Sequence, residues 1–264
     1  MVKVIVCGAL GRMGRRIIEL SLQDREVEVV GGVEHPDCIP SLDLGEALGK
    51  EELKGKPLTS RLEEVLPHGD VVIEFSGNPT AAVGHAKLTA LEKKASVIGT
   101  TGFTDKEIEE IKELSKEAPI LLSPNMSLGV NLLFKLVEIA ASVLRDKNFD
   151  AEIMEIHHRF KKDAPSGTAV KLARILSETL GRKKIVHGRE GHAPRSYDEI
   201  GVMALRGGDV VGDHTVFFLG FGERLELTHR ASSRDTFAKG AIEAAKWIKG
   251  REAGFYTMFD VLGL

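Results

Sequence analysis

The chain has 264 residues, of which 42% are hydrophobic and 28% are charged, a composition typical of a globular protein that can form two compact lobes. Its 36 basic and 39 acidic residues give a net charge of −3, which argues against nucleic acid or an anionic membrane surface as the partner. No run of about 18 apolar residues is present, so we expect no membrane span. The only cysteines, Cys7 and Cys38, give no disulfide framework, and we expect a cytoplasmic protein.

Short β-branched runs alternate with helical stretches over the first 125 residues or so. We expect strands at 2–7, 27–34, 70–76, 95–99 and 119–122, and helices at 12–22, 80–94 and 104–117. Thr104 and Glu107 form a capping box at the start of the last helix. Residues 36–67 have weaker periodicity and are expected to form loops with a short helix or two. Continuous apolar strands alternating with helices predict a Rossmann-type, doubly wound parallel sheet.

The pattern changes after Asn125. We expect helices at 127–145, 166–180 and 235–249, and strands at 150–160, 199–206, 210–219 and 224–230. Short turns such as the one from Arg206 to Asp209 favour hairpins, so this lobe is predicted to be α+β with a mixed sheet. The predicted domains are a dinucleotide-binding domain at 1–126, to which 235–264 return, and a substrate-binding and oligomerisation domain at 127–234.

A glycine-rich turn follows the first strand and opens the first helix. Gly8, Gly11 and Gly14 permit a tight turn whose backbone N–H groups can approach a pyrophosphate at the helix N-terminus. The spacing is not the commonest one, and a close-packed turn would show the same glycines. Glu34, however, ends the second strand about 20 residues later, where an acid hydrogen-bonds the adenosine ribose. Together these features predict dinucleotide binding.

Two further turns end strands of the same sheet, Gly99 to Gly102 and Ser123 to Met126. Open α/β sheets bind ligands at the carboxyl ends of their strands, although turn chemistry alone accounts for either segment.

The densest signal in the second lobe is the segment EIHHRFKKDAPSGT at 155–168. It leaves a strand, passes a cationic turn and enters a helix whose free N–H groups suit a carboxylate. No metal site is predicted, because His157 and His158 are adjacent on a strand and point to opposite faces. A solvated basic turn remains an alternative. His157 and Lys161 can meet one substrate only if the chain bends, since an extended strand would separate them by about 13 Å.

These segments, with VIGTTGF at 97–103, Asn125, SLGVN at 127–131, REGH at 189–192, VGDH at 211–214 and GERLELTHRASSR at 222–234, resemble the dihydrodipicolinate reductase family over essentially the whole chain. The resemblance implies a Rossmann lobe and a substrate lobe whose sheets assemble a homotetramer. It also implies NADH or NADPH as cofactor, and reduction of 4-hydroxy-tetrahydrodipicolinate, a cyclic imine dicarboxylate, in lysine and diaminopimelate biosynthesis.

By this resemblance, His157 and Lys161 match the family's acid/base residues, with Lys161 as the expected proton donor. His158, Gly167 and Thr168 match the substrate contacts. The cofactor contacts fall on Gly8, Ala9, Leu10, Gly11, Arg12, Met13, Glu34, Gly99, Thr100, Thr101, Ser123, Pro124, Asn125 and Met126.

One residue departs from the family pattern. Many members carry Arg after the ribose-binding acid, whereas this chain has His35, so we expect NADH to be used at least as well as NADPH. Two alternative functions remain at this point. One is a related two-lobe reductase for another amino-acid precursor, for which the chain offers no nucleophilic cysteine. The other is a non-catalytic dinucleotide sensor, which would need neither His157 nor Lys161.

Overall fold

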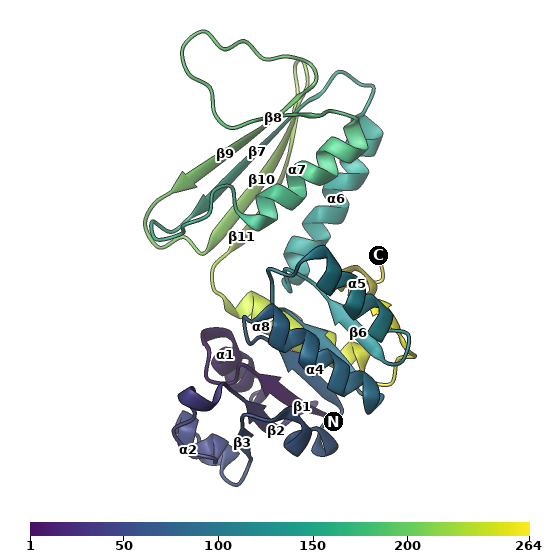
Figure 1. The fold of residues 1–264 in the computed structure, drawn as a ribbon. Coiled ribbons are helices and arrows are strands. Elements are labelled where there is room, and N and C mark those ends of the chain that lie inside the picture. The colour runs from purple at the N-terminus through teal and green to yellow at the C-terminus, as the bar shows by residue number, and fades with distance from the viewer. The chain divides into compact units, whose positions relative to one another are not determined.

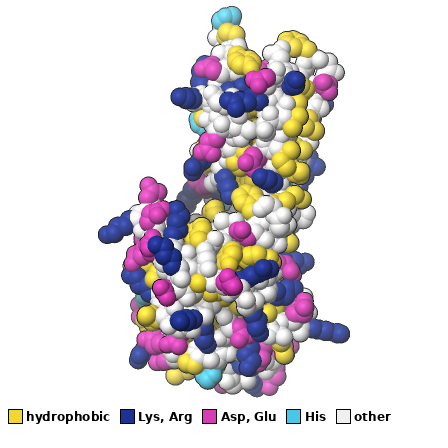
Figure 2. All heavy atoms as spheres, turned by 90° about the vertical axis from the view of Figure 1, so that its right-hand side faces the viewer, with side chains coloured by type: hydrophobic (Ala, Val, Ile, Leu, Met, Phe, Trp, Pro, Cys, Tyr) yellow, Lys and Arg dark blue, Asp and Glu magenta, His cyan; other side chains and the backbone are white.

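The computed structural model describes residues 1–264, which form two compact units (Figure 1). The first unit contains residues 1–128 and 235–264, and the second contains residues 129–234. None of the helices is long and apolar enough to cross a bilayer. On the face seen in Figure 2, basic and acidic side chains are interspersed, and they form no continuous basic surface.

A sheet of seven parallel strands organises the first unit, in the order β12-β6-β5-β4-β1-β2-β3. The chain builds outward from β1 through β2 to β3, then returns to the other side of β1 at β4. The topological switch point therefore lies between β1 and β4, and the doubly wound prediction is confirmed. The strands are β1 (Val2–Cys7), β2 (Val27–Val33), β3 (Leu58–Thr59), β4 (Val71–Glu74), β5 (Ala95–Ile98), β6 (Pro119–Leu122) and β12 (Gly254–Tyr256).

Helices cover both faces of this sheet because its strands are apolar on both sides. On one face α1 (Arg12–Ser21) and α8 (Asp235–Ile248) bury their apolar sides in the larger core. On the other face, α3 (Leu62–Val65), α4 (Pro79–Leu91) and α5 (Asp105–Leu114) pack in two smaller clusters. The predicted capping box of Thr104 and Glu107 is present at α5. The remaining elements are α2 (Leu44–Leu48), α9 (Met258–Leu262) and the 3₁₀ turns Pro36–Cys38, Glu51–Leu53 and Leu66–His68.

The second unit is a five-stranded mixed sheet, which confirms the α+β prediction. Its order is β11-β10-β7-β9-β8, with β7, β9 and β8 parallel and β10 antiparallel to both β7 and β11. The strands are β7 (Asp150–His157), β8 (Lys184–Val186), β9 (Glu199–Arg206), β10 (Gly212–Leu219) and β11 (Arg224–Ala231), and the helices are α6 (Leu128–Leu144) and α7 (Gly167–Leu180). Helix α7 packs on the buried face of β7, whose residues alternate strictly between buried and half-exposed.

The prediction of a hairpin at Arg206 to Asp209 is wrong, because the strands on either side of this turn, β9 and β10, are separated in the sheet by β7. The turn instead crosses the end of β7: the N–H groups of His158 and Arg159 donate to the carbonyls of Val210 (2.7 Å) and Gly208 (3.2 Å). Strands β10 and β11 do form a hairpin.

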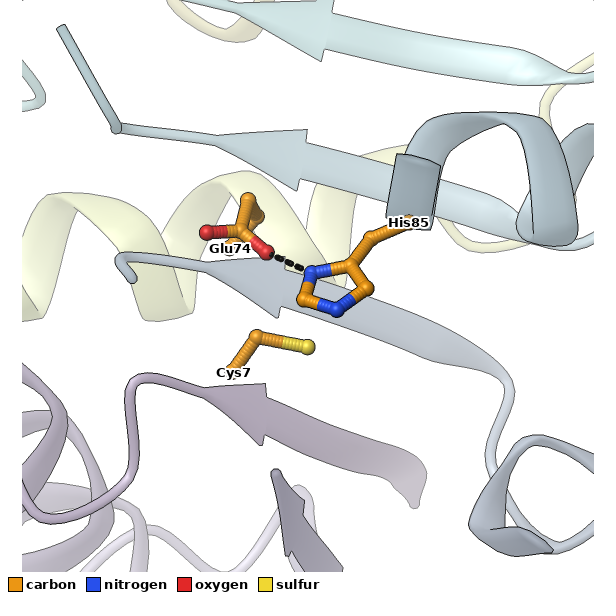
Figure 3. A group of neighbouring side chains, drawn as sticks. All are labelled: Cys7, Glu74 and His85. Atoms are coloured by element: carbon orange, nitrogen blue, oxygen red, sulfur yellow. Dashed lines mark hydrogen bonds and ion pairs between the residues drawn. The ribbon is translucent and has the colours of Figure 1, made fainter. Parts of the chain in front are cut away.

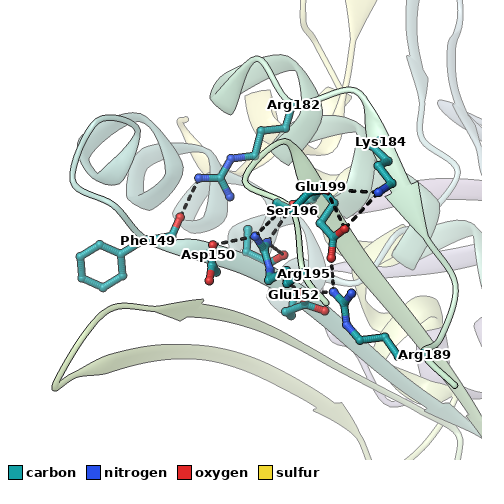
Figure 4. A network of polar contacts seen from close by, with 10 residues as sticks. Phe149, Asp150, Glu152, Arg182, Lys184, Arg189, Arg195, Ser196 and Glu199 are labelled. Atoms are coloured by element: carbon teal, nitrogen blue, oxygen red, sulfur yellow. Dashed lines mark hydrogen bonds and ion pairs between the residues drawn. The ribbon is translucent and has the colours of Figure 1, made fainter. Parts of the chain in front are cut away.

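An ion-pair network ties the long connection between β8 and β9 to the sheet (Figure 4). Arg195 binds Asp150 (2.6 Å) and Glu152 (3.0 Å), and Arg189 binds Glu199. Glu199 is 1% exposed. Burial opposes its ionisation, but hydrogen bonds from Arg189 and Ser196 outweigh burial and lower the pKa of Glu199 to about 2. The network therefore holds this loop most firmly while Glu199 is ionised.

Candidate active site

The glycine-rich turn leaves no room for side chains. Gly8 has a φ of +74°, and a Cβ there would lie 2.5 Å from the carbonyl oxygen of Phe75. A Cβ on Gly14 would lie 2.0 Å from the carbonyl oxygen of Gly8. No side chain caps the N-terminus of α1 at Gly11. The backbone can therefore approach a phosphate closely at a helix N-terminus, as the sequence predicted for a dinucleotide.

Glu34 is held at the edge of this turn. Its carboxylate accepts hydrogen bonds from the backbone N–H of Leu10 (2.8 Å) and from that of His35 (2.9 Å). These bonds place a carboxylate beside the glycine turn on the β2 side of the switch point. A carboxylate in this position can accept hydrogen bonds from ribose hydroxyls. Arg12, within this turn, and His35, next to Glu34, both have exposed side chains.

The other predicted cofactor residues follow β5 and β6 at the same edge of the sheet. Thr101 and Pro124 are exposed. Thr100 and Ser123 are buried and shape the loops: Thr100 donates to Glu74 (3.2 Å), and Ser123 donates to the carbonyl of Asn125 (2.8 Å). Residues 99–101 and 123–126 thus both lie at the carboxyl-end edge of the parallel sheet. There the exposed side chains of Thr101 and Pro124 and the backbone of the two loops face outward. The close-packed glycine turn, whose backbone can approach a phosphate, and the Glu34 carboxylate fit a dinucleotide.

In the second unit, His157 ends β7 and is 8% exposed. Its Nδ1 lies 2.5 Å from Glu155 Oε2. Glu155 is fully buried and also accepts two hydrogen bonds from Arg206 (2.8 and 2.9 Å) and one from the backbone N–H of Ser166 (2.9 Å). One carboxylate thus ties the histidine to the start of α7. The sequence analysis gave no role to Glu155 or Arg206, although Glu155 shares the strand parity of His157.

The pKa shifts of His157 and Glu155 indicate which of the two groups carries a proton at neutral pH. Burial lowers the pKa of His157 and the charges on Lys161 and Arg206 lower it further, so that they outweigh the opposing effect of Glu155. Burial would raise the pKa of Glu155, but hydrogen bonds from Arg206 and His157 hold it below its usual value. At neutral pH we therefore assign a neutral His157 whose Nδ1–H donates to the Glu155 carboxylate. Its Nε2 is then an acceptor.

Two residues of β10 close around this histidine. A Cβ on Gly212 would lie 2.9 Å from His157 Nε2, so only glycine leaves the ring in place. His214 packs edge-on to His157 with ring centroids 5.1 Å apart, and its Nε2 lies 2.9 Å from Ser166 Oγ. Burial and the neighbouring charges lower the pKa of His214 to about 4. His214 is therefore a neutral packing partner for Ser166 at neutral pH.

The chain bends between His157 and Lys161, as their joint use of one substrate requires. The backbone N–H of Lys161 donates to the carbonyl of His158 (3.1 Å) in a turn that ends the strand three residues earlier than expected. Lys161 Nζ lies 2.8 Å from Asp163. Its charge is near enough to influence His157.

Helix α7 begins at Gly167, where Ser166 Oγ accepts a hydrogen bond from the N–H of Ala169 (3.2 Å). Gly167 is exposed, and His158 and Thr168 are half-exposed. The second unit therefore places a buried Glu–His pair, a partly exposed lysine and a helix N-terminus within one short segment. Such a set can bind a carboxylate and move a proton.

Residues 2–126 match the family model described as dihydrodipicolinate reductase, N-terminus, and residues 129–262 match the model for its C-terminus. The chain belongs to the dihydrodipicolinate reductase family. It is 85% identical over 263 residues to the 4-hydroxy-tetrahydrodipicolinate reductase of Aquifex aeolicus, covering 100% of this chain and 99% of the relative. It is 47% identical over 268 residues to the enzyme of that name from Syntrophus aciditrophicus, with 100% and 99% covered.

A solved structure supports the same fold. Dihydrodipicolinate reductase from Paenisporosarcina sp. TG-14, with dipicolinate bound, matches with a TM-score of 0.81 and 26% identity over 98% of each chain. The resemblance seen in the sequence is therefore confirmed. Members of this family are NADH- or NADPH-dependent oxidoreductases.

Proposed function

We propose that this chain reduces 4-hydroxy-tetrahydrodipicolinate to tetrahydrodipicolinate with NADH or NADPH, a step of lysine and diaminopimelate biosynthesis. The observation that carries the proposal is the arrangement of Glu155, His157 and Lys161 beside the N-terminus of α7, in a chain of this family. The first unit is assigned to the dinucleotide, and the second to the substrate and to assembly.

The start of α7 is the proposed site for the substrate carboxylates. The N–H groups of Gly167 and Thr168 lie in its first turn, where the helix dipole favours an anion. His158 and Lys161 add hydrogen-bond donors from the preceding turn. A dicarboxylate bound there would bring its ring to the segment that carries His157 and Lys161.

The protein's own part in the reaction is orientation, charge and a proton. The 4-hydroxyl of the substrate leaves as water before or with the reduction, and NADH or NADPH would supply the hydride to that ring carbon. Lys161 then donates a proton to the electron-rich ring position, and its positive charge stabilises negative charge on the ring before that transfer. His157 is already paired through Nδ1 with Glu155, so its Nε2 is the atom that can exchange a proton with Lys161 or substrate.

For the cofactor, Glu34 is proposed to bind the adenosine ribose, with Gly8 to Met13 around the pyrophosphate. The segments 99–101 and 123–126 at the same sheet edge complete the proposed contacts. No lysine or arginine directly follows Glu34, and a 2′-phosphate would meet its carboxylate. Arg12 is the cation in this turn that can still bind such a phosphate.

One assay tests the proposal against both alternatives. The chain is mixed with NADH and the condensation product of pyruvate and aspartate semialdehyde, and NADH oxidation is followed by absorbance. We expect turnover, and competition by pyridine-2,6-dicarboxylate against the substrate rather than against NADH. NADH binding without turnover would favour a dinucleotide sensor. Turnover only with another amino-acid precursor would favour the related reductase.

A homotetramer is proposed to form through the second sheet. The face of β7 and β10 opposite their buried residues carries half-exposed Met154, Ile156 and Phe217. Sheet faces and edges of this size are normally covered. A monomer mass that stays independent of concentration in light scattering would contradict this assembly.

We also propose a cytoplasmic location, which suits two unpaired cysteines.

A further inference from the structure

A buried carboxylate at the end of β4 has no part in the function proposed so far. Glu74 is 1% exposed and pairs in register with Cys7 on β1, while His85 approaches from α4 (Figure 3). A buried carboxylate is costly unless hydrogen bonds compensate it fully. Its partners therefore indicate what it holds in place.

Three donors surround Glu74. His85 Nδ1 lies 2.5 Å from Oε2, and the backbone N–H of Ser76 (2.7 Å) and the hydroxyl of Thr100 (3.2 Å) donate to Oε1. The thiol of Cys7 lies beside them, within 4.8 Å of the carboxylate. Burial would raise the pKa of Glu74, but the bonds from His85 and Ser76 hold it below its usual value. Glu74 is thus an ionised carboxylate saturated with donors.

A metal ion is the other interpretation of Cys7, Glu74 and His85, whose ligand atoms lie within 4.8 Å of one another. One observation opposes it. The Glu74 oxygens are already occupied by N–H and O–H donors. The cluster is therefore a hydrogen-bonded one.

Two of the donors to Glu74, Ser76 and Thr100, come from two loops at the ligand-binding edge of the sheet. Thr100, after β5, also accepts from the N–H of Gly77 after β4 (3.2 Å). The Phe75 ring lies directly against Gly99, where a Cβ would be 2.2 Å from it. Glu74 and Thr100 together cross-link residues 75–78 to residues 99–101.

The strand order indicates which end of a dinucleotide these loops face. Glu34 lies on the β2 side of the switch point and the glycine turn lies at it, whereas β4 and β5 lie on the other side. With adenosine at Glu34 and the pyrophosphate on the glycine turn, the nicotinamide half must extend over the ends of β4 and β5.

We propose that Glu74 and His85 are positioning residues for the nicotinamide half of the cofactor, acting through the loops 75–78 and 99–101. This inference rests on the proposed use of NADH. It gives the buried pair a role in reaction geometry that differs from adenosine binding, because the hydrogen bonds of Glu74 reach the loops after β4 and β5, whereas Glu34 is bonded to Leu10 and His35.

Calorimetric titration with NADH and with ADP tests the separation, since ADP carries only the adenosine and phosphate groups. For Glu74→Gln and His85→Phe we expect the Kd for NADH to rise at least tenfold, about 1.4 kcal/mol, and the Kd for ADP to stay within twofold. The matched control is Thr89→Val, which removes another buried hydrogen bond between α4 and β5, the one that joins Thr89 Oγ1 and Ser96 Oγ (2.6 Å), and should leave both constants unchanged.

Equal weakening of NADH and ADP would overturn the inference, because it would show a general loss of structure. Unchanged NADH binding would overturn it as well. If Glu74→Gln does not fold, His85→Phe decides, since His85 is 18% exposed at its side chain and tolerates replacement more easily. Failure of the natural chain to bind NADH would overturn the proposed function itself, and would be seen before any variant is made.

Discussion

Gly212→Ala tests whether the position of His157 matters to turnover. The added Cβ would lie 2.9 Å from His157 Nε2, against ordinary contacts of 3.4 Å or more. The ring must therefore move by about 0.5 Å, because the Gly212 backbone is held in the β10 ladder. The ring cannot swing freely, since its Nδ1 is bonded to Glu155.

The size of the effect follows from this displacement. A misplacement of about 1 Å at a reacting group can cost roughly 10²-fold in rate, so a shift of about half that size should lower kcat by about tenfold or more. The KM for NADH should not change, because Gly212 belongs to the second unit and the proposed dinucleotide residues belong to the first. Overpacking should also reduce the free energy of unfolding by about 1–3 kcal/mol.

The assay is NADH oxidation at saturating substrate, with urea unfolding in parallel. The control is Gly207→Ala, in the connection that leads from β9 to Gly212 at the start of β10, where an added Cβ would have nothing within 4 Å. We expect the control to keep the natural kcat. A folded Gly212→Ala variant with kcat within about twofold of the natural chain would refute the reasoning, because the histidine would then tolerate displacement.

Three other predictions concern the proton donor, the cofactor and the pH dependence of folding. Lys161→Ala and His157→Ala should each lower kcat/KM by about 10²–10⁴-fold while NADH still binds in calorimetry; near-normal turnover in both would contradict the assignment. The natural chain should use NADH at least as well as NADPH, and His35→Arg should move the ratio of kcat/KM values toward NADPH; a natural preference for NADPH above about tenfold would show that Glu34 and His35 were misread. Because the pKa of Glu199 falls from 4.5 to about 2 on folding, the stability that its ionised form contributes is present above pH 4.5 and is lost as the pH falls toward 2. The urea midpoint should therefore drop less steeply over this pH range in Glu199→Gln than in the natural chain. Parallel plots of urea midpoint against pH for the two proteins would refute the linkage.

The local features of this protein could be predicted from the sequence. The glycine turn, the capping box at Thr104 and the helix start at Ser166 each depend on residues close together in the chain, so short-range sterics and hydrogen bonding determine them. The alternation of apolar strands and helices likewise predicts the parallel sheet of the first unit. The roles assigned to His157 and Lys161 came from a contiguous motif shared with a family, and they remain predictions.

The tertiary structure decided what connects these local features. A turn sequence such as the one after Arg206 specifies a change of direction, but it does not specify which strands become neighbours. The predicted hairpin between β9 and β10 was therefore wrong, because β7 lies between these two strands and pairs with both. The partners of the two buried glutamates are equally non-local. Arg206 is 51 residues from Glu155, and Thr100 is 26 residues from Glu74. Contacts of this kind exist only after strand order and register are set, because pairing between distant strands brings the side chains together.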